Sequence, residues 1–100
     1  MRIERDGDKT TLFAKGKIFA VNAPLFANDM EKAIEGTTEL TLDCTDLEYI
    51  SSSGLRVVLL AVKTMDGKGT IRITNVSEDV YEVLEATGFT GVADVEIKAE

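Results

Sequence analysis

Histidine is absent from this 100-residue sequence, and its absence excludes one large class of enzymes. A Ser–His–acid triad needs an imidazole to take the proton from the nucleophilic serine, so this chain cannot form one. A small enzyme with a serine activated by another base remains an alternative, although no local motif identifies such a base. The GxxxxGK[S/T] loop that cradles nucleotide phosphates is also missing. We therefore expect no catalysis and no cofactor.

Basic clusters, long apolar runs and cysteine pairs are missing as well. Eleven Lys and Arg residues against 18 Asp and Glu residues give a formal net charge of −7. That balance argues against nucleic acid, because proteins bind it largely by neutralising phosphates with Lys and Arg. No apolar run approaches the roughly 20 residues that span a bilayer, and the charged start MRIERDGDKT is unlike a signal peptide. The sequence thus predicts a soluble, cytoplasmic protein with no membrane insertion, folded as a single domain over residues 1–100.

The stretch from Leu40 to Leu60, LTLDCTDLEYISSSGLRVVLL, predicts a strand followed by a helix. Apolar and polar residues alternate from Leu40 to Cys44, which is the period of a β-strand and predicts a buried Cys44. The single cysteine has no partner for an internal disulfide. The following helix, Leu55 to Met65, is apolar around most of its circumference, so we expect it to be packed inside the domain. Replacing Leu59 or Leu60 with Ala should then cost about 2–5 kcal/mol, the range for buried leucines.

Further strands and helices are predicted on both sides of this unit. The turn-like DGDK joins two strands into a hairpin, and Ile18 to Val21 is either a third strand or the end of the second. Together these elements give an α/β fold in which helices pack on a sheet. Four further elements are predicted. A helix begins at Asn22 and Pro24 and ends at Gly36, and a strand at Thr70–Thr74 runs parallel to Leu40–Cys44. A second helix is capped by Ser77 and ends at Gly88, with a buried face of Val80, Tyr81, Val83 and Leu84, and a last strand lies within Val92–Ile97.

Ser51, Ser52, Ser53 and Gly54 lie where the central strand gives way to the helix. Serine is among the preferred residues at a helix start, because its hydroxyl accepts a hydrogen bond from an unpaired amide of the first turn. The same geometry presents a hydroxyl at the positive end of the helix dipole, where a phosphate is tolerated. Capping and phosphorylation are compatible in one residue.

Three acids precede the serines and offer an alternative site for a hard cation. They are Asp43, Asp46 and Glu48. Calcium-binding loops have a characteristic ligand spacing that this stretch lacks, so we expect solvated acids and no metal.

The serine turn, its setting and the order of elements resemble the STAS domain, typified by bacterial anti-sigma-factor antagonists. The resemblance covers essentially the whole chain and is most specific in LDCTDLEYISSSGLRVVLL and VYEVLEATGF. It implies a mixed β-sheet with helices mainly on one face. It also implies that a serine or threonine at the start of the second helix is phosphorylated by an anti-sigma factor that is itself a serine kinase. Phosphorylation releases this partner, and a serine phosphatase restores the form that binds it and so frees a sigma factor for transcription.

The family turn reads Asp-Ser-Ser-Gly or Asp-Ser-Thr-Gly, and here Ser51 replaces the acid. The resemblance places the phosphoacceptor at Ser52, with Ser53 as the runner-up, and the partner-binding surface at Ser51–Gly54 and Arg56. A second hypothesis keeps the fold without the switch. In it the chain is a STAS subunit of a lipid-transport complex or a stress-signalling scaffold that binds its partner constitutively.

Overall fold

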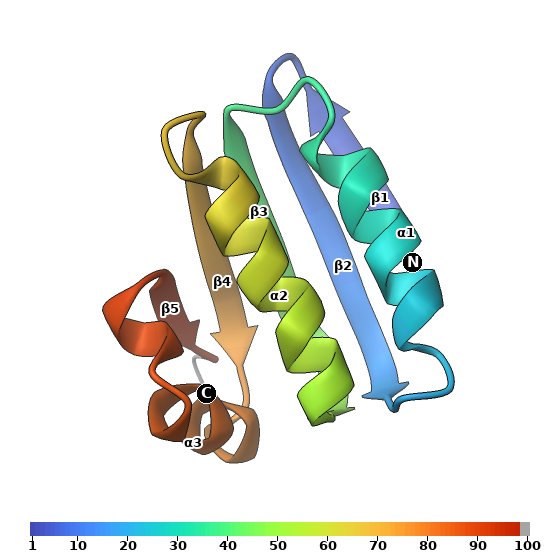
Figure 1. Ribbon diagram of the computed structural model, residues 1–100, viewed down its shortest axis with the longest axis vertical. Helices are drawn as coiled ribbons and strands as arrows, with labels where there is room; N and C mark the ends of the chain where they lie inside the picture. The colour runs from blue at the N-terminus through green and yellow to red at the C-terminus, as the bar shows by residue number, and fades with distance from the viewer. Residues whose placement is uncertain (99–100) are drawn as a thin grey trace.

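The computed structural model describes residues 1–98 and consists of a five-stranded sheet with helices packed against it (Figure 1). The strands lie in chain order across the sheet. β1 runs antiparallel to β2, and the other neighbouring pairs are parallel, which confirms the predicted mixed sheet. The elements are β1 (Arg2–Asp6), β2 (Lys9–Ile18), α1 (Ala23–Ile34), β3 (Glu39–Ile50), α2 (Ser52–Met65), β4 (Thr70–Val76), α3 (Glu78–Ala86), the short 3-10 helix η1 (Phe89–Gly91) and β5 (Asp94–Ile97).

The N-terminal hairpin forms around the DGDK turn as predicted, with Ile3 opposite Leu12. Its second strand continues through Gly16, which has a φ of +73°, and ends at Ile18. The register between β2 and β3 shifts on both sides of Gly16, as expected at a β-bulge. The apolar run from Ile18 to Val21 is therefore the end of the second strand followed by a turn, and not a third strand.

Strand β3 is the centre of the sheet, bonded to β2 on one side and to β4 on the other. Leu40 pairs with Ile71, which confirms the predicted parallel neighbours. The strand runs to Ile50, six residues beyond the predicted end at Cys44. Cys44 is buried as predicted, and burial, helped by the charge of Asp43, raises the pKa of its thiol to about 12. The thiol is therefore protonated and unreactive at neutral pH.

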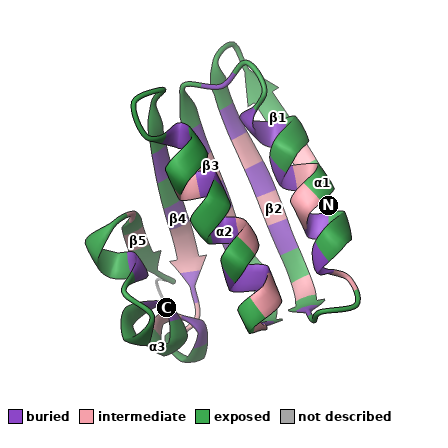
Figure 2. Ribbon diagram, viewed as in Figure 1, coloured by how far each residue is buried: buried purple, intermediate pink, exposed green. Residues whose placement is uncertain are grey.

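Helices α1 and α2 lie side by side over one face of the sheet, and the core lies between these two layers (Figures 1 and 2). Asn22 stands at the start of α1, but its side chain caps no helix amide. Its Oδ1 accepts a hydrogen bond from the Phe19 amide at 2.7 Å, and its Nδ2 donates to the Lys17 carbonyl at 2.9 Å. Asn22 thus fixes the turn between β2 and α1. None of the helices in the described part of the chain is long and apolar enough to cross a bilayer.

Helix α2 is not buried around its circumference, and here the prediction was wrong. Leu59 and Leu60 are 37% and 57% exposed, whereas the opposite side of the helix, including Val58 and Ala61, is buried against the sheet. The fold has two layers, and no element within residues 1–98 covers the outer side of this helix (Figure 2). Val83, predicted on the buried face of α3, is likewise 37% exposed.

Leu60→Ala is therefore expected to lower the free energy of unfolding by less than about 1 kcal/mol, because little apolar area is lost from a half-exposed side chain. The matched control is Leu42→Ala in β3. Leu42 is fully buried, and its truncation should cost about 2–5 kcal/mol. Urea denaturation of both variants measures the difference, and equal losses would contradict this placement of Leu60.

Candidate functional site

The serine turn forms where the carboxyl ends of β2 and β3 meet the first turn of α2, at the lower end of that helix in Figure 1. The Ser51 amide donates to the Ile18 carbonyl at 2.8 Å, which ties the turn to β2. The Ser51 hydroxyl accepts a hydrogen bond from the Gly54 amide at 3.3 Å, so Ser51 is the N-cap residue of α2. This confirms the predicted capping role of a serine in the turn.

Gly54 is required by the close approach of α2 to the strands beneath it. A Cβ at this position would lie 2.6 Å from Cγ1 of Ile50 and 2.8 Å from Cγ2 of Ile18. Both isoleucines are buried, so they have little room to move aside. Only glycine allows the first turn of α2 to sit this close, and that packing fixes the position of the neighbouring serines.

Among the three serines, Ser52 is the exposed one, and Ser51 and Ser53 are half-buried. Ser52 is the first residue of α2, and its hydroxyl forms no hydrogen bond with any residue that the structure describes. Arg56 is exposed one helical turn further along. The residues predicted for the site, Ser51–Gly54 and Arg56, are thus brought together on one short segment at one end of the sheet.

An exposed apolar surface, which we call the apolar rim, lies beside the serine turn. It begins at Phe19, the residue after Ile18, whose carbonyl accepts the hydrogen bond from the Ser51 amide. The rings of Phe19 and Tyr49 are in contact, with centroids 5.3 Å apart. Val21 and Leu25 follow Phe19 in the chain, and the exposed fractions of the four side chains range from 46% to 87%. The rim consists of Phe19, Val21, Leu25 and Tyr49.

The sequence did not identify the apolar rim. The sequence pattern places Phe19 and Val21 in a short apolar run that is typical of a strand, and it gives no surface role to Tyr49. The available signal was Leu25, a leucine directly beside the buried position Phe26 at the start of α1.

The three acids considered for a cation do not form a ligand cluster. Within residues 1–98 no group of three or more acidic, cysteine or histidine side chains is placed to hold a metal ion. Asp43 instead accepts hydrogen bonds from the Thr45 hydroxyl at 2.6 Å, the Thr45 amide at 2.9 Å and Asn75 Nδ2 at 3.3 Å. Partial burial alone would raise the pKa of Asp43, but these hydrogen bonds and the charge of Arg2 outweigh burial and leave it below its usual value.

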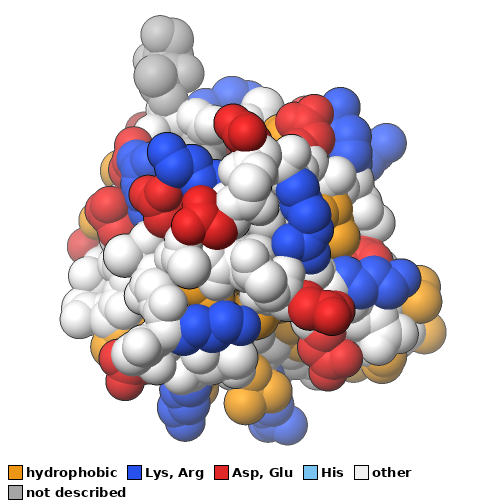
Figure 3. Space-filling view, turned by 90° about the horizontal axis from the view of Figure 1, so that it is seen from above, with side chains coloured by type: hydrophobic (Ala, Val, Ile, Leu, Met, Phe, Trp, Pro, Cys, Tyr) orange, Lys and Arg blue, Asp and Glu red, His pale blue; other side chains and the backbone are white. Residues whose placement is uncertain are grey.

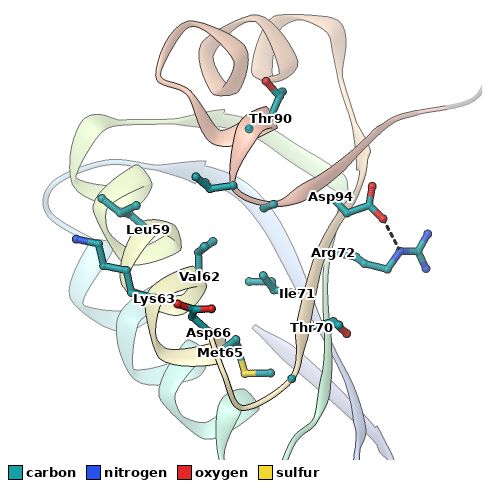
Figure 4. A pocket seen from close by; sticks show the side chains of 14 residues that line it. Leu59, Val62, Lys63, Met65, Asp66, Thr70, Ile71, Arg72, Thr90 and Asp94 are labelled. Atoms are coloured by element: carbon teal, nitrogen blue, oxygen red, sulfur yellow. Dashed lines mark ion pairs between the residues drawn. The ribbon is translucent and has the colours of Figure 1, made fainter.

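A cavity of about 820 Å³ lies between the C-terminal half of α2, β4 and the η1–β5 segment (Figure 4). Its lining includes the aliphatic side chains of Val62, Ile71 and Ala93, and Arg72 pairs with Asp94 at 3.5 Å on one side. No residue of the serine turn lines this cavity. The end of the molecule opposite the serine turn, seen in Figure 3, carries intermingled acidic and basic side chains.

Comparison with known proteins identifies sequence relatives along most of the chain. The family model of the STAS domain matches residues 1–98. BtrV of Bordetella bronchiseptica, described as a candidate anti-sigma factor antagonist, is 32% identical over 83 residues, which are 81% of this chain and 72% of the relative. The anti-sigma-B factor antagonist of Listeria monocytogenes is 28% identical over 95 residues, which are 92% of this chain and 82% of the relative.

The fold is similar to that of SpoIIAA, an anti-sigma factor antagonist and Bacillus cell fate determinant whose structure is known in unphosphorylated and phosphorylated forms. The TM-scores are 0.75 and 0.74, with 16% identity in both cases. The matches cover 99% and 94% of this chain and 88% of SpoIIAA. At this identity the likeness concerns the fold alone. The family model and the sequence relatives show that the chain belongs to the STAS domain family of anti-sigma factor antagonists.

Proposed function

We propose that this chain is a non-catalytic, phosphorylation-switched binding protein that acts in the cytoplasm as a single STAS domain over residues 1–100. Its unmodified form binds an anti-sigma factor with serine-kinase activity and so frees a sigma factor for transcription. The observation that carries the proposal is the exposed Ser52 hydroxyl at the first position of α2. Ser52 follows Ser51, whose amide is bonded to the carbonyl of Ile18, the residue before Phe19 of the apolar rim. The names of the sequence relatives, which are anti-sigma factor antagonists, support an anti-sigma factor as the partner.

The serine turn and the apolar rim together form the proposed partner surface. Apolar side chains are exposed to water in the free protein. When a partner buries them, the binding free energy becomes more favourable by about 25 cal/mol per Å² of apolar surface. Aromatic residues and arginine are also the side chains that most often dominate binding energy at protein interfaces. Phe19, Tyr49 and Arg56 supply these types on the proposed surface.

A phosphate on Ser52 would work against this interface. It adds about −1.5 to −2 charges near neutral pH. Burying this charge in the interface would cost desolvation free energy, and acidic groups of the partner would repel it. The unpaired amides of the first turn of α2 stabilise the phosphate locally, so the domain keeps its shape. The partner is released, and a serine phosphatase resets the switch.

Incubation with the cognate anti-sigma factor and ATP is expected to add one phosphoryl group, roughly 80 Da, measured by intact mass. Ser52→Ala should gain no mass and should still bind the partner, because only an exposed hydroxyl is lost. Ser53→Ala is the matched control and should be phosphorylated normally. Phosphate mapped to Ser53 alone would overturn the assignment of the acceptor.

One observation favours the second candidate, a constitutive STAS subunit of a lipid-transport complex or a stress-signalling scaffold. Ser51 is neutral where the family turn carries an acid. The same experiment separates the two candidates. A constitutive subunit would co-purify with a partner and gain no phosphate under any nucleotide condition.

A further inference from the structure

Arg56 lies four residues after Ser52 on α2, so the two side chains share one face of the helix, one turn apart. Helical side chains lean toward the N-terminus, so the Arg56 side chain lies over the turn that begins at Ser52. Both residues are exposed. The guanidinium forms no ion pair or hydrogen bond within residues 1–98.

No carboxylate of the helix competes for this cation. The first turn of α2 contains no acidic residue, although the chain has 18 of them, and the first turn of α3 carries Glu78 and Asp79. At the strand ends that lead into the serine turn, the nearest charged residues in sequence are Lys17 on β2 and Glu48 on β3. Within residues 1–98 neither of these two residues forms an ion pair with Arg56 or with any other side chain.

We propose that Arg56 is the intramolecular counter-ion of a phosphate on Ser52. This inference rests on the proposed modification of Ser52. A guanidinium presents a planar fork of N–H donors that matches two phosphate oxygens. The Gly54 amide already donates to the Ser51 hydroxyl. The Ser52 and Ser53 amides at the helix start have no partner among the described residues, so they can donate to the third phosphate oxygen.

The pairing gives the switch two effects from a single modification. In the unmodified protein Arg56 is free to contact the anti-sigma factor. In the phosphorylated protein the phosphate holds it. Phosphorylation thus withdraws a cation from the partner surface while adding an anion beside it.

The test measures the pH titration of the phosphate by phosphorus NMR, on protein that carries phosphoserine at position 52 incorporated during translation. A nearby cation favours the dianion, so the titration midpoint should lie roughly 0.5 pH unit lower in the wild type than in Arg56→Gln. Arg56→Lys should lie between them. Lys63→Gln is the charge-matched control. Lys63 is exposed on the same helix, 11 residues or about 16 Å from Ser52, which is beyond the Debye length of about 8–10 Å. Its replacement should therefore leave the titration midpoint unchanged.

Equal midpoints in the wild type and Arg56→Gln would overturn the inference. Because the phosphate is introduced without a kinase, this result does not depend on the anti-sigma factor. Failure of the proposed function would look different, since the phosphorylated and unmodified proteins would then bind the partner equally whatever the midpoints are. Circular dichroism of Arg56→Gln verifies that this exposed substitution leaves the fold intact.

Discussion

A phosphate on Ser52 is expected to weaken binding to the anti-sigma factor by about 100-fold or more. Like-charge contacts at a protein interface cost several kcal/mol, and each 1.4 kcal/mol is a factor of ten in affinity. Ser52 is exposed beside the apolar rim, so an interface that covers the rim must also cover the phosphate or leave a gap there. Calorimetric titration of the unmodified and enzymatically phosphorylated proteins measures the ratio of the two affinities.

Two variants make this result interpretable. Ser52→Ala should bind like the unmodified protein, because Ser51, and not Ser52, caps the helix. Ser52→Asp should bind with intermediate affinity, since a carboxylate carries less charge than a phosphate. If the phosphorylated and unmodified proteins bind equally, Ser52 is not the switch.

Phe26→Ala is expected to lower the free energy of unfolding by about 3–5 kcal/mol, the range for a truncated core phenylalanine. Phe26 is 1% exposed in the layer between α1 and the sheet. Total stabilities of small domains are about 5–15 kcal/mol, so this loss removes a large share of the free energy of unfolding. Guanidinium denaturation followed by circular dichroism gives the value.

The neighbouring residue provides the control for that variant. Leu25 is 67% exposed in the apolar rim, so Leu25→Ala should cost less than about 1 kcal/mol of stability. Its effect should instead be on partner binding. A loss of stability like that of Phe26→Ala, or unchanged binding, would remove Leu25 from the proposed surface.

The parts of the fold that follow from local chemistry could be predicted from the sequence. Alternation identified the strands at Leu40–Cys44 and Thr70–Thr74, and both lie where expected as parallel neighbours. Ser51 and Ser77 cap α2 and α3, because a hydroxyl before a helix meets an unpaired amide whatever the rest of the chain does. The serine turn itself is local too, and for that reason its position was predictable.

The parts that depend on contacts between distant segments were missed. Leu59 and Leu60 were expected inside because an apolar helix signals burial, but the number of layers that cover a helix is a property of the whole fold. The apolar rim forms because the end of β2 meets the end of β3, with Lys17 opposite Tyr49, and this register is interrupted by the bulge at Gly16. A one-residue shift of a strand moves each of its side chains to the other face, so the neighbours of Phe19 could not be read from its sequence context.

The tight fit at Gly54 has a consequence for how the proposed switch would convey information. Ligands and modifications often act by shifting a balance between two pre-existing conformations. The size of the shift is limited by how much more strongly the ligand or modification favours one conformation than the other. Here the first turn of α2 rests directly on Ile18 and Ile50, so tilting it would open a void in the core. This packing disfavours a second arrangement of the first turn of α2. In the proposed switch, phosphorylation of Ser52 would therefore change the charge of the surface and not the shape of the domain. The partner would distinguish the two forms by the difference in its binding free energy for them.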